Sequence, residues 1–247
     1  MAHPRSGSNS LVEILETQPG LAIVNEPFNE NYATWGEGNS DYLGRLRAGE
    51  SLDELVDEVF SAASGVKELS YRLEGDLLHR LASRPDVRVI TLRRRNLLQT
   101  ALSQLLAEQT GLWKTWDATG PLEDTYRDLE PLDVDLVKER MDWTAHEVAR
   151  VESAVADLDV LRLVYEEVFA ADEAVKREQI DKVWRFLGLP RSCSPVVDHF
   201  LSPAVQQARP STYGRLPNLA EIEALLGSDE TGHLEFGGGA DGRRDGV

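Results

Sequence analysis

The sequence has little cysteine, few positive charges and no long apolar run. Its single cysteine, Cys193, excludes both a disulfide framework and a zinc cluster built on cysteine ligands. No apolar stretch approaches the roughly 18 residues that a membrane-spanning helix needs. The opening MAHPRSGSNS contains no apolar signal region. We therefore expect a cytoplasmic chain with no transmembrane segment.

The shortage of positive charge narrows the range of partners. Lysine and arginine total 26 against 43 aspartates and glutamates, which gives a formal net charge of −17. Such a charge disfavours non-specific binding to nucleic acid or to an anionic membrane. A single small anion can still bind, because local arginines and backbone amides can oppose the overall field.

The pattern of apolar residues predicts an α/β fold. The chain has 247 residues, of which 41% are hydrophobic, so it can bury the core of one or two domains. Short apolar runs predict strands at residues 21–25, 66–71, 87–92 and 159–165. Amphipathic patterns predict helices at residues 51–63, 74–83, 96–109, 135–157 and 173–187. Strands that alternate with helices predict a mainly parallel central sheet flanked by helices.

One domain over residues 1–236 accounts for this pattern, and the glycine-rich residues 237–247 are typical of a disordered tail. Two long segments inside the domain contain Trp35, Trp113 and Trp116. Because long loops in compact domains usually serve a function, we expect these segments to border a binding site. The tryptophans are candidates to line an acceptor site, although such residues more often anchor a core or a loop.

Residues Pro4–Ser10 (PRSGSNS) form the first candidate site. Gly7 permits a close backbone approach or a positive φ, and an apolar helical pattern starts at Leu11. Amide groups at a helix start attract anions, and Arg5 adds a permanent positive charge. The segment lacks the GxxxxGK[ST] pattern of a Walker A loop. It predicts a phosphate site; the alternative is a polar N-terminus with an ordinary serine cap.

Residues Arg93–Ser103 (RRRNLLQTALS) form the second candidate, directly after the clearest predicted strand. Ligands of open α/β sheets collect beyond the carboxyl ends of strands, which is where we expect Arg95. Ser103 follows about two helical turns later, so one face of a helix can present both residues to an anion. The alternative is a solvated basic cluster.

Together these segments resemble the nucleotide-binding elements of sulfotransferases that use 3′-phosphoadenosine 5′-phosphosulfate (PAPS). PRSGSNSL resembles the loop that holds the 5′-phosphosulfate, and the pair Arg95 and Ser103 resembles the site for the 3′-phosphate. NEPF at 25–28, LVYEEVF at 163–169 and the helix end WRFLGLP at 184–190 follow in the order of the family. The resemblance implies a single sulfotransferase-like domain with a three-layer, P-loop-like fold.

The resemblance also implies a reaction and its residues. A sulfuryl group would pass from PAPS, the co-substrate, to a hydroxyl or amine of a small-molecule, carbohydrate or lipid acceptor, with no metal. By match to the family motifs, Arg5 would stabilise charge on the transferring group. The residues that would bind PAPS are Arg5, Ser6, Gly7, Ser8, Asn9, Ser10, Arg95, Ser103 and Tyr165, with Arg209 and Arg215 as alternatives for a further 3′-phosphate contact.

The acceptor needs a general base, and Glu26 is the candidate. It follows a predicted strand and matches the Glu-Pro position of the family. The alternative is an ordinary turn carboxylate in a loop that also contains Glu30 and Glu37. His3 is a rival by residue type only. Lys67 is a minor candidate for a second cation.

The chain departs from the family at its start. The phosphate loop of the family follows an apolar strand of about five residues, whereas only Met1–His3 precede Pro4. We therefore expect a truncated first strand, which would leave neighbouring strand edges unpaired. Two other functions stay open. One is a P-loop kinase or nucleotide-binding enzyme, which would require a lysine in the loop. The other is a catalytically impaired binding module with the sulfotransferase fold.

Overall fold

The structure is a computed structural model that describes residues 1–30, 40–73, 76–113, 122–202 and 210–234. The chain groups into two compact units. The first combines Met1–Arg95 with Trp143–Val205, and the second combines Asn96–Asp142 with Gln206–Val247. The predictions for Trp35, Trp116, Arg209 and the tail 237–247 concern residues outside the described ranges.

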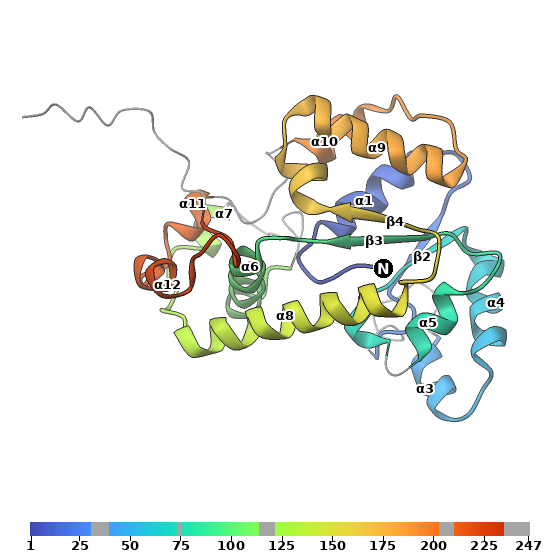
Figure 1. The fold of residues 1–247 in the computed structure, drawn as a ribbon, viewed down its shortest axis with the longest axis horizontal. Coiled ribbons are helices and arrows are strands. Elements are labelled where there is room, and N and C mark those ends of the chain that lie inside the picture. Colours follow the sequence, from blue (N-terminus) through green and yellow to red (C-terminus); the bar gives the residue numbers. More distant parts are fainter. Residues whose placement is uncertain (31–39, 74–75, 114–121, 203–209, 235–247) are drawn as a thin grey trace, which may run out of the picture. The chain divides into compact units, whose positions relative to one another are not determined.

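The strands of the first unit pair in parallel. β1 (Ile23–Asn25) pairs with β2 (Gly65–Lys67), and β3 (Val89–Arg93) pairs with β4 (Val160–Val164). Each lies within or close to a predicted strand, so the prediction of a mixed α/β chain with parallel strands is confirmed (Figure 1). β2 is shorter than its apolar run, because the chain turns into a 3₁₀ helix, η1 (Ser70–Arg72), where the strand was expected to continue.

The first residues of the chain lie between these strand pairs. Ala2 forms parallel bridges with Leu69 on one side and with Leu92 on the other. The Met1 amino group donates to the Ile90 carbonyl at 2.7 Å. The Leu92 amide donates to the Met1 carbonyl at 3.0 Å, as in a parallel ladder. The order across the unit is therefore β1, β2, Met1–His3, β3, β4, with the start of the chain in the central place.

Helices pack around these strands in the first unit. They are α1 (Ser8–Leu15), α3 (Tyr42–Arg47), α4 (Leu52–Ala62), α5 (Leu77–Ala82), α9 (Glu173–Leu187) and α10 (Pro195–Leu201). A π-helical turn, η3 (Glu166–Ala170), follows β4. Helix α8 (Val134–Ala154) begins in the second unit and ends in the first. The helices α4, α5, α8 and α9 lie close to the ranges predicted from the sequence, whereas α3 and α10 were not predicted.

Alternate side chains of the strands join different apolar clusters. Val89 and Val160 pack in a cluster with α4, α5 and the end of α8. Ile90 and Leu161 pack in a cluster with α1, α9 and α10. Since neighbouring residues of a strand point to opposite faces, helices cover both faces of these strands.

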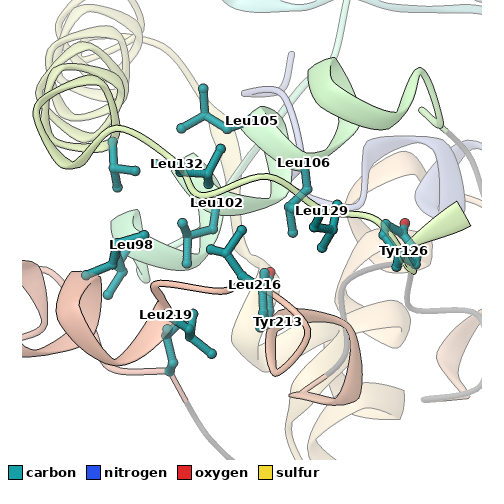
Figure 2. Packing of buried hydrophobic residues seen from close by; sticks show 14 of the residues in the cluster. Leu98, Leu102, Leu105, Leu106, Tyr126, Leu129, Leu132, Tyr213, Leu216 and Leu219 are labelled. Carbon is teal, nitrogen blue, oxygen red and sulfur yellow. The ribbon is translucent and has the colours of Figure 1, made fainter. Parts of the chain in front are cut away.

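The second unit contains α6 (Leu97–Thr110), α7 (Leu122–Thr125), α11 (Pro210–Tyr213), α12 (Leu219–Leu226) and the first part of α8. The Asn96 side chain caps α6 by accepting from the Gln99 amide at 2.8 Å, and Gly111 ends the helix with a φ of 70°. Figure 2 shows the leucines of α6 packed with Tyr213, Leu216 and Leu219. This leucine-rich core belongs to the second unit alone.

Candidate functional site

The carboxyl ends of the parallel strands meet at one edge of the first unit. Glu26 follows β1, Glu68 follows β2, and Arg94 and Tyr165 follow β3 and β4. From Met1–His3 the chain goes first to β1 and β2 on one side and later to β3 and β4 on the other, so the strand order reverses there. Ligands of open α/β sheets bind beyond the carboxyl ends at such a reversal. This edge is therefore the candidate functional site.

The loop that follows Met1–His3 is tightly folded. Arg5 and Gly7 both have a positive φ, 63° and 84°. The buried Ser6 hydroxyl donates to the His3 carbonyl at 2.6 Å. A positive φ is strained for arginine but open to glycine. Gly7 is the N-cap residue of α1, so the loop predicted to hold a phosphate leads directly into a helix start.

Gly7 lies against two aromatic side chains from the end of β4 and from η3. A Cβ atom at position 7 would lie 2.7 Å from Phe169 Cε2 and 3.1 Å from Tyr165 Cδ2. The first separation is too short for two carbon atoms, so glycine suits both the φ and the contact. The Arg94 guanidinium lies 4.3 Å from the centre of the Tyr165 ring, in a cation–π contact. The loop therefore packs against the rings of Tyr165 and Phe169, which together form an aromatic wall.

The start of α1 offers hydrogen-bond donors. The amides of Ser8, Asn9 and Ser10 precede the first intrahelical bond, which the Leu11 amide makes to the Gly7 carbonyl at 3.1 Å. These N–H groups and the helix dipole favour an anion. Asn9 Oδ1 is buried and has no hydrogen-bond partner among the described residues. Such an orphaned atom needs an explanation, and rotation of the carboxamide would present its NH₂ donors to a bound anion. These residues fit a phosphate group.

Arg95 contacts the same segment of chain that packs on Gly7. Its guanidinium pairs with Glu167 at 2.5 Å, and its backbone amide donates to Glu166 at 3.0 Å. The Arg95 side chain is 54% exposed, so this ion pair contributes little stability and can exchange for another anion. The predicted phosphate loop and the predicted 3′-phosphate arginine therefore both contact residues 165–169.

Glu26 and Lys67 form a buried ion pair at the ends of β1 and β2. Their side chains are 13% and 8% exposed. Asn29 Nδ2 donates to Glu26 Oε2 at 2.9 Å, and Arg72 Nε lies 3.8 Å from the same oxygen. The predicted general base is therefore held in one orientation between two cations. Sequence reasoning gave Lys67 only a minor role and missed Arg72.

Glu68 is a second acid at this edge, and sequence reasoning missed it. Its side chain is almost fully buried, and Oε1 accepts the Phe28 amide at 2.7 Å. Burial raises the pKa of this carboxyl to about 8, although the Phe28 hydrogen bond acts in the opposite direction. The carboxyl is therefore mostly protonated near neutral pH. Its place directly after a strand was the available signal in the sequence.

His3 is buried beneath the loop. Its ring meets the Trp143 ring edge-on with centroids 5.3 Å apart, and Nδ1 lies 3.0 Å from the Pro4 carbonyl oxygen. Burial lowers the pKa of His3. These contacts indicate that His3 packs beneath the loop, although its buried Nε2 has no hydrogen-bond partner among the described residues. Glu26 therefore stays the better candidate for the base.

Two of the described residues that are predicted to contact the nucleotide belong to the second unit. Ser103 is buried on α6. Arg215 follows α11, and its amide donates to the Thr212 carbonyl at 3.2 Å. Their grouping with Arg95 and the loop stays a prediction. Of the predicted acceptor-site tryptophans, Trp113 is described and about half exposed.

The described ranges lack two further kinds of feature. No cluster of three or more His, Cys, Asp or Glu side chains could hold a metal ion. No helix in those ranges has both the length and the apolar character that crossing a membrane requires. Comparison of the sequence with protein-family models gives no match. Comparison with curated proteins gives no match either.

Proposed function

We propose that this chain is a sulfotransferase that uses PAPS as its co-substrate. The loop His3–Gly7 carries the proposal: it has two residues of positive φ, lies at the reversal of strand order and ends at the start of α1. A loop of this kind presents backbone amides to a phosphate group. Parallel strands with helices on both faces support a P-loop-like, three-layer fold for the same unit.

Each end of the nucleotide would have its own set of contacts. Arg5 and the amides of Ser8–Ser10 would hold the 5′-phosphosulfate. Arg95 would exchange Glu167 for the 3′-phosphate, which its exposure favours. By the family resemblance, Ser103 and either Arg209 or Arg215 would add contacts to the 3′-phosphate. Tyr165 would lie against the adenine.

The acceptor would be activated at the ends of β1 and β2. PAPS supplies a sulfuryl group whose bond to the 5′-phosphate oxygen breaks as a bond to the acceptor oxygen or nitrogen forms. Glu26 would take the acceptor proton on a carboxylate oxygen, and Lys67 would orient that carboxylate. Arg5 and the helix amides would oppose the charge left on the phosphate oxygen. Positioning and electrostatics would supply most of the catalysis.

A thermal-shift titration tests the proposal. We expect PAPS, and the product 3′,5′-bisphosphate, to raise the melting temperature by about 5 °C or more near saturation without Mg²⁺. Arg5→Gln should weaken this binding about tenfold or more, because it removes a charged hydrogen-bond donor. Arg191→Gln is the matched control, since Arg191 pairs with Asp181 on the surface. Transfer of labelled sulfate to a panel of phenol, carbohydrate and lipid acceptors would then identify the acceptor class.

Other outcomes would replace the proposal with a different function. Stabilisation by ATP only, and only with Mg²⁺, would indicate a kinase or another nucleotide-binding enzyme. Stabilisation by PAPS without transfer to any acceptor would indicate a binding module. Equal losses in Arg5→Gln and Arg191→Gln would exclude the loop His3–Gly7 as the site.

A further inference from the structure

The turn Glu26–Asn29 holds the candidate base in a conformation that its own sequence disfavours. Glu26 has a φ of 56°, in the left-handed region that suits glycine and strains a residue with a side chain. Pro27 follows, and a proline further restricts the backbone of the residue before it. Strained residues persist only where the surrounding structure fixes them, so contacts from outside the turn must hold Glu26 in place.

Two backbone hydrogen bonds define the turn. The Asn29 amide donates to the Glu26 carbonyl at 3.0 Å, which closes a β-turn with Pro27 at its second position. The Glu26 amide donates to the Lys67 carbonyl at 2.6 Å, which continues the pairing of β1 with β2. Neither bond uses the amide of Phe28. Because Phe28 is only 1% exposed, its amide needs a partner inside the protein.

Glu68 supplies that partner from the end of the neighbouring strand. Its Oε1 atom accepts the Phe28 amide at 2.7 Å. The Phe28 ring packs beside Tyr42 in the apolar cluster around α4 and α5. The turn is therefore fixed by a hydrogen bond and by an apolar contact, both of which come from outside its own four residues.

The two acids at this edge are held in different states. Glu26 pairs with Lys67, whereas burial raises the pKa of Glu68 to about 8. A neutral Glu68 accepts the Phe28 amide without competing with Glu26 for the Lys67 ammonium group. Glu68 Oε2 is buried and has no hydrogen-bond partner among the described residues, so the bond to Phe28 is the contact that explains this internal polar side chain.

We propose that Glu68 is a positioning residue for Glu26: its carboxyl group holds the Phe28 amide, fixes the turn and so directs the Glu26 carboxylate towards Lys67. The inference rests on the proposed function for the role of Glu26 as a base, whereas the hold on the turn does not. The same turn brings Asn29 Nδ2 to Glu26 Oε2 at 2.9 Å, so a shift of the turn would disturb both oxygens of the base. Glu68 would touch neither PAPS nor the acceptor.

Two substitutions separate the hydrogen bond of Glu68 from its charge. Glu68→Gln keeps a neutral acceptor for the Phe28 amide, whereas Glu68→Met removes the acceptor with a flexible chain of similar length. We expect Glu68→Met to lower kcat for sulfuryl transfer about tenfold or more and to change the Kd for PAPS less than about twofold. Glu68→Gln should restore most of the lost kcat. If Glu68→Met does not fold, Glu68→Leu replaces it.

A packing control and a double variant test whether the effect passes through the base. Val183→Ala removes buried volume from the other apolar cluster of the same unit, so it should lower stability without this loss of kcat. In a chain that already carries Glu26→Gln, Glu68→Met should lower kcat less than about twofold further. Losses that multiply in full would overturn the positioning role.

Amide hydrogen exchange tests the hold on the turn without any transfer assay. Glu68→Met should speed exchange at Phe28 and Asn29 about tenfold or more, whereas Glu68→Gln should change it less than about threefold. No sulfuryl transfer by the parent, together with this exchange pattern, would reject the proposed function and still support the hold of Glu68 on the turn. Unchanged exchange at Phe28 in Glu68→Met would overturn the inference whatever the activity.

Discussion

The two halves of the candidate site carry similar ion pairs in different surroundings. At the ends of β1 and β2, the side chains of Glu26 and Lys67 are 13% and 8% exposed. At the ends of β3 and β4, those of Arg95 and Glu167 are 54% and 41% exposed. Removing one partner of a buried pair leaves a charge that water cannot reach, whereas an exposed pair loses little. On the proposed function, the first half would therefore hold a base in place, and the second would form a contact when the nucleotide binds.

Substitution of Lys67 is the strongest test of this difference between the two ion pairs. Lys67→Met should lower the free energy of unfolding by about 3–5 kcal/mol, because Glu26 would stay buried without its main partner. Urea unfolding measures the change. The double variant Glu26→Gln with Lys67→Met should recover most of the loss. If Lys67→Met lowers the free energy of unfolding by less than about 1 kcal/mol, the Glu26–Lys67 pair behaves like an exposed ion pair. The two halves of the site would then not differ.

Gly7 allows a test of the loop His3–Gly7, which packs against Tyr165 and Phe169. Gly7→Ala should cost about 2–4 kcal/mol, since the new Cβ meets Phe169 and the φ is positive. Gly20→Ala is the matched control: Gly20 has a φ of 81°, and a Cβ there would have no neighbour within 4 Å. We expect about 1–2 kcal/mol for the control. Equal losses in the two variants, compared by denaturant midpoints, would show that the aromatic wall does not constrain the loop.

The buried half should also respond to pH. The pKa of Glu68 is raised from 4.5 to about 8, so its contribution to stability is full below pH 4.5 and is lost as pH rises through 8. The pKa of the Met1 amine is lowered from 8.0 to about 6, so its contribution rises as pH increases from 6 to 8. These slopes oppose each other in the parent.

Glu68→Gln should remove the first slope and leave the second. The stability of the variant should then rise more steeply between pH 6 and 8 than that of the parent. Chemical unfolding at a series of pH values measures both curves. Parallel curves would mean that Glu68 does not titrate in this range.

The smallest stability effect is expected in the exposed half. Glu167→Gln should change the free energy of unfolding by less than about 1 kcal/mol. On the proposed function it should tighten binding of the 3′,5′-bisphosphate several-fold, because Arg95 would no longer have to leave a carboxylate. Calorimetric titration measures the affinity, and Glu178→Gln, an exposed glutamate paired with Lys182, is the control. Weaker binding in Glu167→Gln would contradict the exchange.

Local patterns predicted much of the fold but little of the pairing. The short apolar run at 87–92 and the amphipathic pattern at 173–187 were visible in the sequence, and β3 and α9 lie where these patterns predicted. The Glu26–Lys67 pair could not be predicted, because it depends on Asn25 lying opposite Lys67 in a parallel register. No local sequence pattern specifies which strands pair with one another.

Short helices were missed for a different reason. Helix α10 is only 7 residues long, so its apolar period is too brief to recognise, although the Ser194 cap and Pro195 at its start were available signals. The burial of Glu68 is a similar case. A glutamate beside a lysine is ordinarily a surface residue, whereas the tertiary fold buries Glu68 and brings the Phe28 amide to its carboxylate.

The partly buried and hydrogen-bonded Met1 nitrogen should respond weakly to amine-reactive reagents. Acylation needs access to the nitrogen lone pair, and here the amino group is partly buried and donates a hydrogen bond to the Ile90 carbonyl at 2.7 Å. A dye intended for the α-amino group would therefore reach surface lysines such as Lys182 first.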